Sequence, residues 1–175
     1  ISRMLEVFKS LGINVEALPD PDTGEKTSLK ITPPKEWDVT KINRESASKM
    51  RSVLMLLGSL VHFNKDFLLP HAGGCKMGAR TVAAHKHGLE ELGVQIDVLD
   101  DDYKSVSPDF SEGVDHDSER EIIMYEASDT AAINLLIAAA RMPGKTVIKY
   151  APPNYQVQDV CYFLQSFGVR IDGIG

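Results

Sequence analysis

The sequence has few cysteines, no long apolar run and no excess of positive charge, and each shortage excludes a class of protein. Two cysteines in 175 residues are too few for a disulfide framework. The longest apolar run, residues 53–61, is too short to cross a bilayer and contains Gly58 and Ser59. A net charge of −6 gives no general attraction for nucleic acid or anionic lipid. We therefore expect a cytoplasmic globular protein with neither a nucleic-acid nor a membrane partner.

The sequence does contain one pattern three times: a helical apolar stretch, then a glycine, then an alternating strand. The copies span residues 4–18, 82–99 and 157–174. Their junctions contain Gly12, Gly93 and Gly168, the residue type that favours the left-handed conformation at a helix end. Three copies of one helix-strand unit are predicted.

A second kind of helix precedes copies two and three. It covers residues 49–63, with Ser48 as its N-cap, and residues 130–141, with Ser128 or Asp129 as its N-cap. A strand follows each of these helices, and two further strands would complete small sheets. The four predicted strands are 66–69, 146–150, 28–32 and 121–125.

These elements predict an α/β fold of repeated units, covering about residues 1–45, 46–125 and 126–175. The first unit lacks its opening helix and strand, which suggests a chain that begins partway through a domain. Residues 19–26 and 100–121 are polar and turn-rich, and the second segment holds nine acidic residues. Both are predicted to be exposed connectors.

The segment between the strand at 66–69 and the following helix has the composition of a reactive loop. It contains three glycines, which allow close approach of a ligand to the backbone, and Cys75 flanked by Lys76 and Arg80. Nearby cations and a helix N-terminus would lower the pKa of this thiol. From composition alone, a flexible loop with an incidental cysteine is an equal alternative, because Gly-Gly pairs are common in turns.

The spacing of residues in this loop resembles that of enolpyruvyl transferases, in the branch that acts on UDP-N-acetylglucosamine. The matching loop and helix residues are Pro70, Gly73-Gly74-Cys75, Gly78-Ala79-Arg80, Val82, His85, Gly88-Leu89-Glu90 and Leu92-Gly93. Supporting matches are Met50-Arg51-Ser52, Leu57-Gly58, Gly144-Lys145-Thr146-Val147-Ile148, Val160, Phe163-Leu164 and Gly168. The similarity covers nearly the whole chain from Ser46 onward.

The resemblance implies an inside-out α/β barrel of repeated units as the fold. It also implies transfer of the enolpyruvyl group of phosphoenolpyruvate to the 3-hydroxyl of UDP-N-acetylglucosamine with release of phosphate, the first committed step of peptidoglycan precursor synthesis. In that family two such domains close on the substrates, so a second homologous domain is an expected partner. This chain alone is expected not to turn over substrate.

The resemblance also assigns roles to single residues. Cys75 would protonate the methylene carbon of phosphoenolpyruvate and could form a covalent adduct, and Arg51 and Arg80 would hold its phosphate and carboxylate. His85 would lie beside the nucleotide and Ser128 at its diphosphate, although an ordinary N-cap is an equal alternative for Ser128. The full set of expected substrate-binding residues is Gly74, Lys76, His85, Ser128, Asp129 and Thr130.

Several positions depart from the family pattern, and they leave the acceptor and the activity open. The departures are Ala83 for an Asp, Glu126 for a Lys, Thr130 for a Gly, and Asn154 and Gln156 for two glutamates. A catalytically silent relative that binds a sugar nucleotide or a partner protein is therefore the alternative prediction. The related shikimate-pathway synthase shares fold and donor but does not use this cysteine loop, so Cys75 argues against it.

No cofactor is expected, since the sequence contains no P-loop and no dinucleotide fingerprint. A zinc site from His71, Cys75, His85 and His87 is disfavoured, because their spacing lacks a paired ligand motif. Helical spacing predicts core packing for the remaining group near the C-terminus. This group consists of Cys161, Tyr162, Phe163, Leu164 and Phe167.

Overall fold

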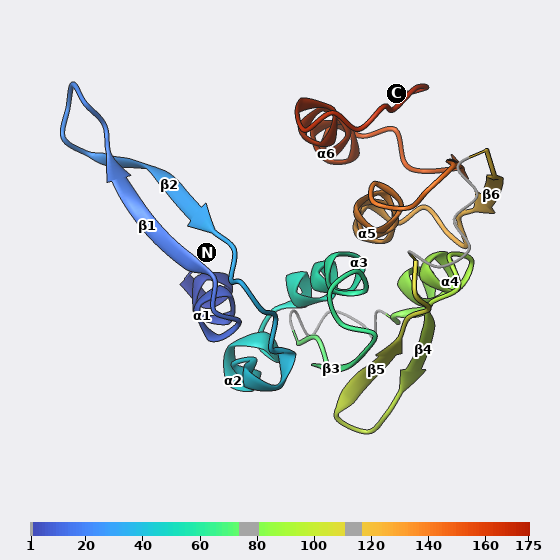
Figure 1. Cartoon of the computed structure of the whole chain (residues 1–175), viewed down its shortest axis with the longest axis horizontal. Helices are drawn as coiled ribbons and strands as arrows, with labels where there is room; N and C mark the ends of the chain where they lie inside the picture. The colour runs from blue at the N-terminus through green and yellow to red at the C-terminus, as the bar shows by residue number, and fades with distance from the viewer. Residues whose placement is uncertain (1, 74–80, 111–116) are drawn as a thin grey trace.

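The computed structural model describes residues 2–73, 81–110 and 117–175. Within these residues the fold is a mixture of short helices and three small sheets (Figure 1). None of the described helices is long and apolar enough to cross a membrane.

The N-terminal part is a helix followed by a β-hairpin, as the first copy of the pattern predicts. Helix α1 (Ser2–Ser10) leads through Gly12, at φ +80°, into strands β1 (Asn14–Pro19) and β2 (Lys26–Thr32). The two strands pair antiparallel. The predicted turn at 19–26 is confirmed, and the Asp20 carboxylate stabilises it by accepting hydrogen bonds from two backbone N–H groups.

The single helix predicted over residues 49–63 is wrong, because this range consists of an extended start, a 3-10 helix and a short α-helix that ends at Leu60. Helix α2 (Arg44–Ala47) is capped by Asn43, and Ser48 is its C-cap rather than the N-cap of a longer helix. Met50 is extended, at φ −140° and ψ 140°, which interrupts the helical path. The chain continues as the 3-10 helix η2 (Arg51–Met55) and helix α3 (Leu56–Leu60), preceded by the short 3-10 turn η1 (Val39–Lys41).

The middle part contains the predicted strand-helix-strand succession and one strand that was not predicted. Strand β3 (Asp66–Pro70), helix α4 (Ala83–Glu90) and strand β4 (Gln95–Val98) confirm the pattern. Strand β5 (Asp102–Val106) falls inside the acidic segment predicted as a connector, and it is the central strand of the antiparallel order β3-β5-β4. Its inward side chains, Tyr103 and Ser105, are buried, which outweighs the polar composition.

In the C-terminal part a two-stranded parallel sheet flanks two helices. Strand β6 (Glu119–Ile123) pairs with β7 (Lys145–Lys149), and helices α5 (Asp129–Ala139) and α6 (Tyr155–Ser166) follow these strands. The third predicted strand, around residues 169–171, is absent from the described residues. The segment lacks a neighbouring strand there, and the Ile171 carbonyl instead accepts a hydrogen bond from the Gln165 side chain at 2.8 Å.

Core packing is confirmed for Cys161 in α6 and is wrong for the aromatic residues beside it. Cys161 is buried, whereas Phe163 and Phe167 are 62% and 73% exposed. The reason is that α6 packs on α5 with one face only, so helical spacing alone does not bury its other faces.

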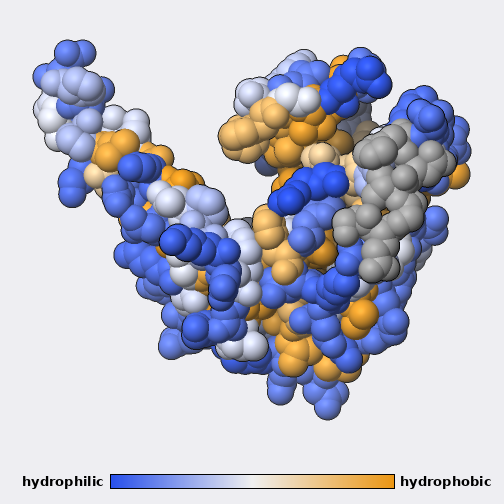
Figure 2. Space-filling model, in the orientation of Figure 1, coloured by the Kyte–Doolittle hydropathy of each residue, from blue (hydrophilic) through white to orange (hydrophobic). Residues whose placement is uncertain are grey.

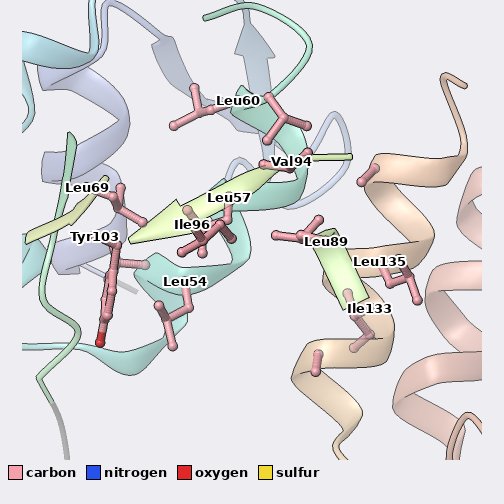
Figure 3. Packing of buried hydrophobic residues seen from close by; sticks show 14 of the residues in the cluster. Leu54, Leu57, Leu60, Leu69, Leu89, Val94, Ile96, Tyr103, Ile133 and Leu135 are labelled. Carbon is pink, nitrogen blue, oxygen red and sulfur yellow. The ribbon is translucent and has the colours of Figure 1, made fainter. Parts of the chain in front are cut away.

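The core lies where α3, α4 and α5 meet, with the sheets around them (Figure 1). Figure 3 shows leucines of η2 and α3 facing side chains from α4, α5 and the β3-β5-β4 sheet. The largest fully buried residues of this core include Leu54, Leu57, Leu60, Leu69, Leu89, Ile96 and Leu135.

The β1-β2 hairpin stands away from this core as an arm (Figure 2). Nearly all of its residues are exposed. The described residues form three separate sheets and do not close into a barrel.

Candidate active site

Arg51 is the predicted site residue whose surroundings the structure describes most fully. It is the first residue of η2, directly after the extended Met50, and its side chain is half-buried. Its Nη2 donates a hydrogen bond to the Thr81 carbonyl oxygen at 3.0 Å. The guanidinium group is thereby fixed at the point where the chain leaves the glycine-rich loop.

Gly73, which directly precedes residues 74–80, lies against the segment that leads to Arg51. Gly73 lies so close to the backbone that a β-carbon there would be 1.6 Å from the Ser48 carbonyl oxygen, so only glycine fits. Residues 48–51 therefore contact both Gly73, just before the loop, and Thr81, just after it. The predicted residues Gly74, Cys75, Lys76 and Arg80 lie outside the described residues, so their roles stay predictions.

His85 is a core residue of α4, with an exposed fraction of 1%. Its Nε2 is 3.3 Å from the Thr130 hydroxyl and its Nδ1 is 3.1 Å from the Asn134 side-chain nitrogen. Burial, and secondarily the positive charge of Arg51, lower the pKa of His85 to about 4. The imidazole is therefore neutral at cellular pH, and it connects to the surface through Thr130.

Asn134 is a buried polar residue of α5 that joins three helices. Its side-chain nitrogen donates to the Leu54 carbonyl of η2 at 2.9 Å, and its oxygen accepts from the Gly58 N–H of α3 at 2.6 Å. The third bond, to His85, reaches α4. Both amide protons and the amide oxygen thus have hydrogen-bond partners, which allows the burial of this side chain.

The other predicted binding residues form the first turn of α5. Ser128 is the N-cap, as predicted, and its hydroxyl accepts from the Ala131 N–H at 3.4 Å. Asp129 begins the helix and Thr130 is exposed. The negative charge of Asp129 already complements the helix dipole at this end, so a phosphate there would need help from cations.

The structure thus brings His85 and Thr130 together, with Asn134 bonded to the other ring nitrogen of His85, whereas Arg51 contacts Thr81. The sequence reasoning missed Asn134. One signal could have found it: it is the one polar side chain in the run 131–140, which is otherwise alanine, leucine and isoleucine.

Two other histidines near the loop have separate surroundings. The rings of His71 and Tyr103 are tilted by 37° to each other with centroids 4.5 Å apart, and the Nε2 of His87 is 3.0 Å from the Ile123 carbonyl oxygen. Among the described residues there is no group of three or more side chains placed to hold a metal ion.

Three of the positions that depart from the family pattern lie at or just before the start of a helix. Asn154 caps α6, with its side-chain oxygen accepting from the Val157 N–H at 3.1 Å. Ala83 is the first residue of α4. Glu126 is exposed just before the first turn of α5, where a negative charge disfavours an anionic ligand.

A family model for EPSP synthase (3-phosphoshikimate 1-carboxyvinyltransferase) matches residues 1–175. A UDP-N-acetylglucosamine 1-carboxyvinyltransferase of Helicobacter pylori is 32% identical over 175 residues, which are 100% of this chain and 38% of that protein. The enzyme of that name from Treponema denticola is 31% identical, over 98% of this chain and 37% of that protein. The chain thus spans less than half the length of these curated relatives. The family match over its entire length shows that the chain belongs to the EPSP synthase family of carboxyvinyltransferases, the enolpyruvyl transferases.

Proposed function

We propose that the protein transfers the enolpyruvyl group of phosphoenolpyruvate to the 3-hydroxyl of UDP-N-acetylglucosamine, in the first committed step of peptidoglycan precursor synthesis. Family membership supports the donor and the reaction type. The names of the relatives from Helicobacter pylori and Treponema denticola support the acceptor. The cysteine in the loop supports this branch over the shikimate-pathway branch.

The structural observation that best supports the proposal is the position of Arg51. Arg51 binds the Thr81 carbonyl at the end of the loop that contains Cys75, and its charge also acts on His85 beneath the start of α5. Arg51 thus contacts the residue that follows residues 74–80, and its positive charge acts on His85. A guanidinium group there supports binding of the phosphate or carboxylate of phosphoenolpyruvate.

In the proposed reaction the acceptor hydroxyl loses its proton to a base of the further protein and its oxygen forms a bond to C2 of phosphoenolpyruvate, while Cys75 gives a proton to the C3 methylene. The double bond is thereby converted into a methyl group on a tetrahedral carbon. The C2–O bond to phosphate then breaks, phosphate leaves, and return of a C3 proton to the Cys75 thiolate restores the double bond. Arg51 and Arg80 would stabilise the anionic groups throughout.

We further propose that this reaction needs more protein than the 175 residues. The three-unit division and the inside-out barrel belong to this proposal, with a second homologous domain closing over the substrates. The relatives' greater length supports it. The exposed Phe163 and Phe167 of α6 and the exposed hairpin are surfaces that further protein could cover.

The second candidate function is a catalytically silent relative that binds a sugar nucleotide and regulates a partner. Glu126 and Asp129 favour it, because both place negative charge near the first turn of α5, where the diphosphate would bind. Phosphate release from phosphoenolpyruvate, measured with several UDP-sugars, separates the two candidates. Steady turnover excludes the silent relative, and binding without turnover excludes the transferase.

The reactive cysteine is tested by covalent labelling of the full-length protein with a phosphoenolpyruvate-mimicking epoxide. Cys75→Ser should abolish the mass increase seen by intact-protein mass spectrometry, because the hydroxyl does not form the reactive anion. Cys161→Ser is the matched control and should keep the label, since Cys161 is buried and burial raises the pKa of its thiol. Equal labelling of wild type and Cys75→Ser contradicts the assignment.

A further inference from the structure

Three hydrogen-bonded side chains lead from the core to the surface at the start of α5. Asn134 is fully buried, His85 is almost fully buried, and Thr130 is exposed. The links are 3.1 Å between Asn134 and His85 and 3.3 Å between His85 and Thr130. Asn134, at the buried end of this hydrogen-bonded series, is bonded to η2 and α3. Thr130, at the exposed end, lies in the first turn of α5, which is proposed to bind the sugar nucleotide.

The direction of each hydrogen bond follows from the backbone groups at the buried end. The Gly58 N–H can only donate and the Leu54 carbonyl can only accept, so these two bonds fix which end of the Asn134 amide is nitrogen. The second proton on that nitrogen points to Nδ1 of His85, which must accept it. A neutral imidazole then carries its one proton on Nε2, where it faces the Thr130 oxygen.

We propose that Asn134 is a positioning residue that holds His85 as the Nε2–H tautomer, and that the Thr130 hydroxyl consequently donates its proton to a phosphate oxygen of the bound sugar nucleotide. The inference rests on the proposed function and adds a specificity-determining hydroxyl to it. The Thr130 oxygen accepts from His85, and no residue of the described part of the chain accepts its proton, which leaves that proton for a bound ligand. The hydroxyl therefore favours an anionic oxygen over a ligand group that is itself a donor.

The low pKa of His85 agrees with this arrangement, because a charged imidazole would carry a proton on Nδ1 as well and would repel the Asn134 donor. The family pattern has a glycine at the position of Thr130, so the hydroxyl group is a feature in which this chain differs from that pattern. A glycine there could not continue the path to the surface.

The first test is the protonation of His85, measured from side-chain 15N chemical shifts of the full-length protein at pH 7. Wild type should show the Nε2–H tautomer. Asn134→Asp should convert His85 to a form protonated on Nδ1, because a carboxylate accepts where the amide donated. A merely structural role of Asn134 would not predict that change. The Nδ1–H tautomer in wild type overturns the inference and leaves the proposed function intact.

The second test is the affinity for UDP, measured by titration calorimetry with the full-length protein. Thr130→Val, which keeps the shape and removes the hydroxyl, should weaken UDP binding about tenfold, as expected for loss of one bond to a charged group. Thr130→Ser should restore it, and the control Thr27→Val in the exposed hairpin should have no effect. Equal affinity of wild type and Thr130→Val overturns the inference alone. Absence of UDP binding by wild type overturns the proposed function and the inference with it.

Discussion

Two regions of the molecule are stabilised in different ways. One is the contact between helices α3 and α5, and the other is the β1-β2 hairpin. At Gly58 the two helices approach so closely that a β-carbon would lie 2.2 Å from the Asn134 carbonyl oxygen, and buried hydrogen bonds join them. In the hairpin the strands pair antiparallel from Asn14 to Pro19, with one register shift between Leu18 and Pro19, yet Leu29 and Ile31 are 51% and 54% exposed. The helices depend on side-chain packing, whereas the hairpin depends on backbone hydrogen bonds.

The difference indicates where stability and function lie in this chain. An isolated two-stranded hairpin is marginal in water, because it buries little apolar surface. The helix contact, in contrast, fixes His85 through Asn134, and His85 in turn contacts Thr130, so a change there should alter both folding and the site. Substitutions in the two regions can measure this contrast directly.

The largest effect is expected from Gly58→Ala. The added methyl group collides with the α5 backbone, and relief of the collision must separate the helices and break the bond to Asn134. We expect a loss of roughly 4 kcal/mol in the free energy of unfolding, measured by urea denaturation. Gly88→Ala in α4 is the control, since its methyl group would meet Leu135 at an ordinary 3.5 Å. Similar denaturation midpoints for the two variants would show that α3 and α5 are not in tight contact.

The next effect is a loss of stability in mild acid that depends on His85. Burial and the charge of Arg51 lower its pKa from 6.5 to about 4, so the unfolded chain takes up a proton at a higher pH than the folded chain does. Stability should therefore fall as pH drops from 6.5 toward 4, by up to roughly 3 kcal/mol. Burial lowers the pKa of His62 too, so part of the slope remains after His85→Gln.

The measurement is the free energy of unfolding of wild type and His85→Gln at several pH values. The wild-type slope should exceed that of the variant. His87→Gln, on the same helix, serves as the control and should keep the wild-type slope. Parallel curves for wild type and His85→Gln would refute a buried neutral His85.

The smallest effect is expected in the hairpin. Ile31→Thr keeps a β-branched side chain at an exposed position, so unfolding of the 175-residue chain should change by less than about 0.5 kcal/mol. The same substitution at Ile122 in β6, which is 1% exposed, should cost about 2 kcal/mol, because it buries a hydroxyl in apolar surroundings. Thermal unfolding followed by circular dichroism gives both values. A large effect of Ile31→Thr in the full-length protein only would show that further protein covers the arm.

Much of the fold could be predicted from the sequence because its signals are local. The glycines after α1, α4 and α6 have φ values of +80°, +87° and +90°, and alternating apolar residues correctly predicted the strands that follow the first two of them. Strand β5 was missed because three aspartates at residues 100–102 obscure its start, and its burial depends on neighbours distant in sequence. The break at Met50 was missed because apolar periodicity continues through it.

For the candidate site, the sequence identified residue types more readily than their surroundings. Of the predicted residues, His85 and Thr130 are within hydrogen-bonding distance of each other, and the charge of Arg51 acts on His85; their roles in binding stay predictions. The burial of His85 and the role of Asn134 could not be predicted, because both depend on how closely α3 and α5 approach. That approach is set by Gly58, whose importance is visible only when the opposing backbone is known.

The attachment of the loop to residues 48–51 has a consequence for protein engineering. The chain enters residues 74–80 beside Ser48 and leaves them beside Arg51, so both boundaries of this stretch are set by one neighbouring segment. A segment of different length or chemistry could therefore replace residues 74–80 between Gly73 and Thr81. The sequence of residues 48–51, which contact both ends of the replaced segment, would stay unchanged.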